Sequence, residues 1–438
     1  MLRIAFEKSL PLQYIILFKI NARGHAVPEY NSSQWKVNLG MLWFSQLLIM
    51  SGFSAMVPFI PLYMKTELGI TDENDLAFYI AMFNVFGSGA YAIFTPLNGM
   101  LGDRFGLKLM LLRGTFLTAF LFPLMGYVSN VWLLIILRFL TAACAGTTAA
   151  SQAMVGRTVP DNKQGFALGM LTTAYWGGAM LGNVLGGLII HYFDYLAAFW
   201  VCGIAYFAAG FAILPTRDKV VHKIRETVAK TAVKSGFFRW VPRFSLPVWG
   251  TLFLLFLLGI SRYFESPFVA LKVEAMTSPE GAAYWTGIVS AMVSVGAILS
   301  GAVIGYLADK VAPHKLFPPM LAIAGGMVAL QGWSSGVWSF CIYRTLAYFV
   351  CGGMQPVLLK LMSSVTPQEQ RGAAFGFSTC FLCIGGMLSA LFAGWSMMYF
   401  SVNGVFYTGA VLFLLLIPVY ITPVIRVEKA AKKLAGAR

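Results

Sequence analysis

The stretch GMLGDRFGLKLMLLR, residues 99–113, places four charged side chains between two long apolar runs. Residues 76–98 and 114–137, on either side of it, contain no Asp, Glu, Lys or Arg. A short charged loop between uncharged runs is typical of a chain that crosses a membrane more than once. The charged residues of the loop are Asp103, Arg104, Lys108 and Arg113.

The whole chain shows the same contrast, because 58% of its 438 residues are hydrophobic and only 11% are charged. Soluble domains carry about 25% charged residues, and about twenty apolar residues suffice to span a bilayer as a helix. We therefore predict an all-α, polytopic membrane protein whose helices satisfy their own backbone hydrogen bonds in lipid. Twelve apolar runs are predicted as transmembrane helices: 37–64, 76–99, 107–127, 131–155, 166–191, 195–214, 247–271, 284–306, 315–332, 336–359, 373–397 and 403–424.

Lysine and arginine are distributed unevenly between the predicted loops. If the N-terminus is cytoplasmic, the cytoplasmic segments hold 27 of the 32 basic residues, and the other side keeps only Lys65 and Lys272. Because cytoplasmic loops are enriched in Lys and Arg, we predict that both termini are cytoplasmic. The stretch around Asp103 is then an inner loop. The net charge of +15 indicates topology rather than nucleic-acid binding.

A polar, basic segment separates the predicted helices six and six. The two halves match in sequence: GMLGDRFGLK from Gly99 aligns with GYLADKVAPHK from Gly305, and VPDNKQGFALG from Val159 aligns with TPQEQRGAAFG from Thr366. Such an ordered series of matches indicates duplication, and parallel repeats are typical of transporters that work by alternating access. The predicted domains are a cytoplasmic tail (1–36), a six-helix bundle (37–214), a basic cytoplasmic linker (215–246), a second six-helix bundle (247–424) and a cytoplasmic tail (425–438).

From about Trp35 to Ile425 the chain resembles the major facilitator superfamily. With PFIPLYMKTELG (58–69) and VPDNKQGFALG, the loop is most similar to the twelve-helix drug:proton antiporters of the MdtG multidrug-resistance type. The resemblance implies a secondary active transporter in the inner membrane of a prokaryote, which exports amphipathic small molecules by proton-coupled alternating access. The first signature of the superfamily matches at Gly99, Asp103, Arg104, Gly106 and Lys108.

The resemblance further implies that the charged loop is a conformational latch between the halves. Asp103 would face the inner start of helix 11, where the positive end of a helix dipole favours a carboxylate. Asp309 and Lys310, at the equivalent place of the second half, would act in the same way against helix 5. The alternative, that these charges serve topology alone, accounts for Arg104 and Lys108 but not for two equivalent aspartates.

Four ionisable side chains lie well inside predicted helices, where a charge costs at least about 2.5 kcal/mol and usually carries function. Arg138, in LRFLTAACAG, matches the family's helix-4 arginine, which is linked to proton coupling, although Thr141 replaces the usual glutamine. Glu265 is the only deep carboxyl, and Arg262 lies three positions before it on the same expected helix face. We predict proton coupling by Glu265 with Arg262 and Arg138. The alternative is a static ion pair of Glu265 with Arg262. The fourth deep charge is Arg344.

The stretch GAMLGNVLGG on predicted helix 5 fits the antiporter signature of the family, except that Asn183 stands in place of its proline. Its glycines give a small-residue face for close helix packing. Packing alone is the alternative to an antiporter role, so the sequence leaves the direction of transport open. The glycines are Gly178, Gly182, Gly186 and Gly187.

The predicted substrate cavity is lined by residues of helices 1, 5 and 10. Aromatic side chains suit promiscuous apolar ligands. Because three deep arginines face one glutamate, a carrier of organic anions or metabolites is the alternative function. The lining residues are Ser51, Ser54, Tyr175, Trp176, Arg344 and Gln355.

Motifs of other function classes are missing from the sequence. It has no HExxH pattern and no phosphate-binding loop of the ATPase type. We therefore expect neither an enzyme nor a receptor without transport, no cofactor apart from the proton gradient, and no bound metal. The expected partners are a small-molecule substrate and the lipid bilayer, with the protein a monomer. The six cysteines all lie in predicted helices and are expected to be free thiols.

Overall fold

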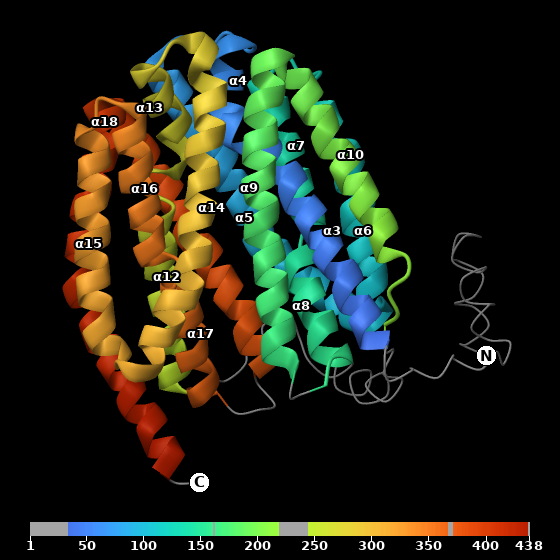
Figure 1. Ribbon diagram of the computed structural model, residues 1–438, viewed down its shortest axis with the longest axis vertical. Coiled ribbons are helices and arrows are strands. Elements are labelled where there is room, and N and C mark those ends of the chain that lie inside the picture. Colours follow the sequence, from blue (N-terminus) through green and yellow to red (C-terminus); the bar gives the residue numbers. More distant parts are fainter. Residues whose placement is uncertain (1–33, 161–162, 219–243, 367–370, 437–438) are drawn as a thin grey trace, which may run out of the picture.

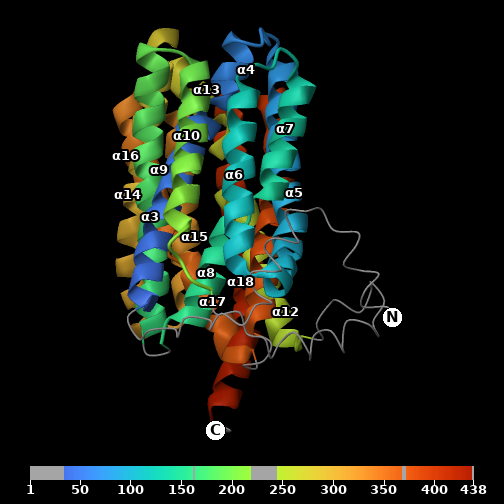
Figure 2. The ribbon, with the colours of Figure 1, turned by 90° about the vertical axis from the view of Figure 1, so that its right-hand side faces the viewer.

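The computed structural model describes residues 34–160, 163–218, 244–366 and 371–436. Within these ranges the chain is helical and contains no strand. The helices form one elongated bundle, in which the first described helix (dark blue) begins at the same end where the last helix (red) finishes (Figures 1 and 2). We call this the N/C end and the other the opposite end. Of the predicted N-terminal tail, residues 1–33 lie outside the described residues and 34–36 belong to the first described helix; most of the basic linker also lies outside.

Polar side chains begin several helices of the opposite end. Their side chains accept hydrogen bonds from backbone amides in the first turns of the helices that follow, as for Asp72, Asn130, Asp194 and Ser278. Such caps satisfy donors that lack an intrahelical partner. The elements of the first half are α3 (Gln34–Met56), η1 (Val57–Phe59), α4 (Ile60–Thr66), α5 (Glu73–Phe105), α6 (Leu107–Met125), α7 (Val131–Cys144), α8 (Thr147–Thr158), α9 (Gln164–Tyr192) and α10 (Tyr195–Ile213). Those of the second half are α12 (Leu246–Arg262), η4 (Ser266–Phe268), α13 (Val269–Met276), α14 (Pro279–Lys310), α15 (Pro313–Trp333), α16 (Val337–Cys351), α17 (Met354–Val365) and α18 (Arg371–Gly436).

The described residues contain eleven helical segments long and apolar enough to cross a membrane. The last of them, Ala374–Val427, has 54 residues, which is far more than one crossing requires. Ser401 interrupts it with a φ of 63° and a ψ of 179°, and Figure 1 shows the chain of α18 turning back toward the N/C end. Counting its two arms separately gives the twelve predicted crossings.

Four of the predicted helices are broken, which corrects the prediction of continuous runs. Predicted helices 1 and 7 are interrupted by the short turns Val57–Phe59 and Ser266–Phe268, each of which contains Pro followed by Phe. A proline removes a backbone donor and clashes with the preceding turn. Predicted helices 4 and 10 are interrupted at residues 145–146 and 352–353. Equivalent helices of the two halves are therefore broken in the same way.

Asn98 on α5 stabilises the break between α7 and α8. Its Nδ2 donates to the carbonyl oxygens of Ala143, at 3.1 Å, and Ala145, at 2.8 Å. Arg113 on α6 in turn donates to Asn98 Oδ1 at 2.6 Å. Gly146, with a φ of 109°, supplies the left-handed residue that starts α8. Carbonyl groups released by a broken helix need such partners inside a membrane, because no water replaces them.

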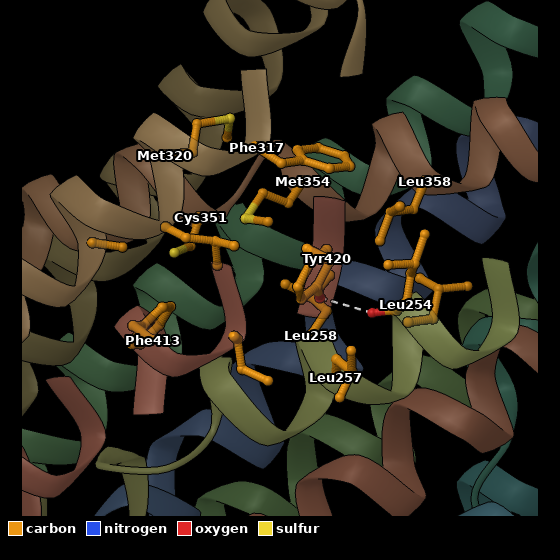
Figure 3. Close-up of a cluster of buried hydrophobic side chains, with 14 of the residues drawn as sticks. Leu254, Leu257, Leu258, Phe317, Met320, Cys351, Met354, Leu358, Phe413 and Tyr420 are labelled. Carbon is orange, nitrogen blue, oxygen red and sulfur yellow. Dashed lines mark hydrogen bonds between the residues drawn. The ribbon is translucent and has the colours of Figure 1, made fainter. Parts of the chain in front are cut away.

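The hydrophobic core joins the two halves at the opposite end. One buried cluster contains Phe59 and Met64 of the first half together with Phe268 and Ala282 of the second. Of the other two clusters, one is confined to the first half near the N/C end and one to the second half. In the latter, the Tyr420 hydroxyl donates to the Leu254 carbonyl oxygen at 2.7 Å (Figure 3). Among the described residues, therefore, the shared core holds the halves together at one end only.

Candidate functional site

The deep charges of the second half gather at the break in predicted helix 7. α12 ends at Arg262, and Glu265 lies in the turn that follows. Carbonyl groups near the break have side-chain partners: Ser389 Oγ donates to the Ile260 oxygen at 2.7 Å, and the Tyr348 hydroxyl donates to the Arg262 oxygen at 3.4 Å. The break therefore places a carboxylate and a guanidinium in the interior without leaving these backbone groups unpaired.

Glu265 pairs with Arg344 and not with Arg262. Arg344 Nη1 lies 3.4 Å from Glu265 Oε1 and 3.2 Å from Oε1 of Gln331 on α15. Glu265 and Arg344 are only 2% and 4% exposed, so this ion pair is buried. The predicted shared face of Arg262 and Glu265 is wrong, because α12 ends at Arg262 and the three-residue spacing is no longer helical.

Arg262 has neutral partners only. Its Nη1 donates to Oε1 of Gln355 at 3.2 Å, and its guanidinium carbon lies 5.4 Å from the ring centroid of Trp176. The Arg262 side chain forms no salt bridge with any described residue, and its buried Nε has no hydrogen-bond partner among them. Because Trp176 belongs to α9, Arg262 contacts both halves.

Arg138 on α7 lies against aromatic rings of its own half. Its guanidinium carbon is 5.1 Å from the ring centroid of Phe53 on α3 and 5.3 Å from that of Phe83 on α5. A Cβ at Gly87 would come within 2.5 Å of Arg138 Nε, so the absence of a side chain at position 87 makes room for this arginine. Like Arg262, it forms no salt bridge within the described part of the chain.

The structure brings some of the predicted cavity residues together and separates others. Trp176 and Gln355 meet at Arg262, and the ring of Tyr175 packs edge-on against Trp176 with centroids 5.2 Å apart. Ser54 is buried on α3, and the backbone carbonyl of Ser51 faces α9. We refer to Arg262, Glu265, Arg344, Gln331, Gln355 and Trp176 as the central site.

The glycines of helix α9 bring it close to two other helices. A Cβ at Gly178, Gly182 or Gly186 would collide with backbone atoms of α3, at Leu47, Ser51 and Ala55 respectively. One at Gly187 would come within 2.9 Å of the Ala283 oxygen and 3.1 Å of the Gly287 Cα, both on α14 of the other half. Asn183, which stands where the signature has proline, is buried, and its backbone oxygen also approaches Gly287.

The model of one protein family matches residues 42–315 and 251–437 of this chain, and its description is Major Facilitator Superfamily. The two matches together cover most of the sequence. The chain belongs to the Major Facilitator Superfamily.

Relatives within the superfamily include two bacterial proteins named Multidrug resistance protein MdtG. The chain is 28% identical over 366 residues to that of Salmonella schwarzengrund (strain CVM19633), covering 82% of this chain and 88% of the relative. It is 28% identical over 393 residues to that of Proteus mirabilis (strain HI4320), covering 89% and 96%. The crystal structure of the human organic anion transporter MFSD10 (TETRAN) superposes with a TM-score of 0.61 at 14% identity, covering 88% of this chain and 99% of that one. At that identity the likeness concerns the fold alone.

The superfamily signature loop lies at the N/C end, between α5 and α6. Gly106 has a φ of 103°, and the amide of Leu107 donates to Asp218 Oδ2 at 2.7 Å, while Lys108 Nζ donates to the Leu214 oxygen. The first residues after α10 thus cover the start of α6. Gly99 and Gly106 are described, but the side chains of Asp103, Arg104 and Asp309 lie outside the described part. Lys310 donates to the hydroxyl of Tyr306. The latch therefore stays a prediction.

Sequence reasoning missed two further lysine sites, both at the opposite end. Lys65 Nζ lies 2.9 Å from both carboxylate oxygens of Glu274, an ion pair between the two halves. Buried Lys272 donates to the Gly332 and Ser334 oxygens and to Asn403 Oδ1, where a cation suits the C-terminus of α15. Lys65 and Lys272 are the two basic residues predicted on the non-cytoplasmic side, and their exception to the charge bias was a signal in the sequence.

Proposed function

We propose that this protein is a proton-coupled secondary active transporter that exports amphipathic small molecules by alternating access. The superfamily membership and the fold support transport between two halves. The names of the MdtG relatives support export of drugs rather than the carriage of metabolites. The buried Glu265–Arg344 pair is the observation that carries the proposal, because it supplies a carboxyl that can take up and release a proton inside the membrane.

Coupling follows from the contacts of this pair. When Glu265 is ionised, it neutralises Arg344; when it is protonated, Arg344 retains Gln331 as its partner and the central site gains one unit of positive charge. The affinity of the site for a charged substrate then differs between the two protonation states of Glu265. The rival interpretation is a static ion pair in which Glu265 stays ionised throughout the cycle.

The orientation and the latch extend the proposal. The distribution of Lys and Arg supports a cytoplasmic N/C end, and the bacterial relatives support a place in the plasma membrane of a prokaryote. The shared core at the opposite end then corresponds to a state closed toward the outside. We propose that Asp103 and Asp309 latch the cytoplasmic ends when the halves rock the other way. Arg138 contributes to proton coupling from the first half, and the protein acts as a monomer.

The substitution Glu265→Gln tests the proposal in reconstituted proteoliposomes. We expect the variant to bind a fluorescent amphipathic drug without net positive charge and to exchange it down a gradient, because the shape of the site is kept. It should not accumulate the drug against a gradient when a pH difference is imposed, because the titrating group is gone. Uphill transport at the wild-type rate would remove Glu265 from coupling and support the static pair.

A further inference from the structure

The two arginines of the central site are in different electrostatic situations. Arg344 faces the carboxylate of Glu265, whereas Arg262 has only the amide of Gln355 and aromatic rings around it. We propose that Arg262 is the specificity-determining residue, which binds an anionic group on an amphipathic substrate, and that Arg344 serves Glu265 instead. The inference rests on the proposed transport function, and it exchanges the roles predicted for these two arginines from the sequence.

Charge is the first argument for this assignment. A buried guanidinium without a carboxylate is unfavourable, and a ligand that supplies a carboxylate, sulfonate or phosphonate offsets the cost of its desolvation. Arg262 is 4% exposed and has no ionic partner in the described part of the chain. Among the described residues of the central site, Glu265 alone could attract a cationic substrate, and that carboxylate is already engaged by Arg344.

Free hydrogen-bonding capacity is the second argument. The Nε of Arg262 is buried and has no acceptor among the described residues, although Nη1 is occupied by Gln355. The Nε of Arg344 is also unpaired among them, but Arg344 already has a carboxylate partner. A planar guanidinium presents its N–H groups in a fork that fits two oxygens of one anion. An anionic group that reaches Nε would therefore satisfy a donor that the protein itself leaves unpaired.

The neighbours of Arg262 fit the other part of an amphipathic molecule. The rings of Trp176, Tyr263 and Tyr348 lie within 5.4 to 5.9 Å of its guanidinium carbon, and Trp176 and Gln355 are partly exposed. Flat apolar groups pack well on such rings. Because Trp176 comes from the first half and Arg262 from the second, a substrate held here contacts both halves, as alternating access requires.

A matched pair of probes tests the inference: pyrenebutyrate, and pyrenebutyltrimethylammonium with the same aromatic body and the opposite charge. Binding is measured with the full-length protein in lipid nanodiscs. We expect wild type to bind pyrenebutyrate about tenfold more tightly or better, and Arg262→Gln to weaken it by about 10- to 100-fold, as for a lost hydrogen bond between charged groups. The affinity for the ammonium probe should not fall.

Two further variants separate this role from a structural one. The double variant Glu265→Gln/Arg344→Gln removes the buried pair together and should keep the preference for pyrenebutyrate. Arg262→Lys keeps the positive charge but lacks the planar guanidinium, so it should keep part of the preference for pyrenebutyrate. The inference would be overturned if wild type bound both probes equally. It would also be overturned if the double variant lost the preference while Arg262→Gln kept it. If the inference failed in this way but wild type still transported drugs uphill when driven by a pH difference, the proposed transport function would stand.

Discussion

Arg138 occupies space that depends on the absence of a side chain at a neighbouring residue. Its Nε would lie only 2.5 Å from a Cβ at position 87, and its guanidinium packs against Phe53 and Phe83. Such contacts hold a cation by about 0.5–2 kcal/mol each, more when water is excluded. The position of this arginine is therefore set by three neighbours and not by a carboxylate.

Gly87→Ala should displace Arg138 from the two rings while leaving its charge in place. We expect proton-driven transport to fall about tenfold, as a shift of about 1.4 kcal/mol would give, with membrane abundance near wild type. Gly40→Ala is the control, because nothing lies within 4 Å of a Cβ at that position. Full transport by Gly87→Ala would show that the exact place of Arg138 does not matter. The readout is pH-driven drug uptake into inverted vesicles.

The deep charges themselves can be predicted from the sequence, because an ionisable residue within a long apolar run is rare and conspicuous. Which of these charges pair with one another cannot be predicted in this way. Arg262 and Glu265 have helical spacing in the sequence, but the helix ends between them, and the partner of Glu265 is 79 residues away on α16. Such a partner depends on how helices pack, which local periodicity does not encode.

At the scale of elements, α9 has two faces with different neighbours. Gly178, Gly182 and Gly186 hold it against α3 of its own half, whereas Gly187 meets α14 of the other half. Backbone contact of this kind provides close packing where lipid gives no hydrophobic driving force between helices. The first contact lies within one half, and the second lies between the two halves.

Gly178→Ala should destabilise the first half, because the new Cβ collides with the backbone of Leu47 on α3. Overpacking of this kind costs about 1–3 kcal/mol, so we expect a clear fall in the thermal unfolding temperature in detergent. Gly177→Ala, one residue earlier on the same helix, faces open space and is the matched control. Equal unfolding temperatures for the two variants would contradict the packing role of this face.

All twelve crossings could be read from apolar runs, although α18 joins the last two in one helical segment with a break at Ser401 between them. What could not be read was the interruption of four helices. Pro58 and Pro267 marked two breaks in the sequence, but proline is tolerated inside membrane helices when neighbours satisfy the freed groups. Whether it bends or breaks a helix depends on those neighbours, of which Asn98 is an example at another break.

At the scale of the whole molecule, the ion pair of Lys65 and Glu274 spans the boundary between the halves. It lies at the end where they share a core, with side-chain exposures of 41% and 11%. Partly exposed pairs contribute about 0.2–1 kcal/mol. That is enough to shift the balance between two conformations of similar energy.

Reversing one charge should favour separation of the halves at this end. In Lys65→Glu, hydrogen–deuterium exchange of α4 and α13 is expected to rise about fivefold, the factor that corresponds to about 1 kcal/mol. The swap Lys65→Glu/Glu274→Lys restores an attractive pair and should return exchange to the wild-type rate. Exchange that stays fast in the swap would mean that position 65 acts through something other than charge.

The close approach of Gly187 to Gly287 also determines how far each part of the molecule travels. If the halves turn about this contact, it acts as a pivot one quarter of the way along α14. The 23 residues that follow Gly287, up to Lys310, extend about 35 Å at 1.5 Å per residue. A rotation of about 10° would then displace the N/C end of α14 by about 6 Å over that length, while atoms near the pivot shift by less than a bond length. A pivot at the glycine contact would therefore turn a small tilt into a wide separation at the N/C end without repacking the contact itself.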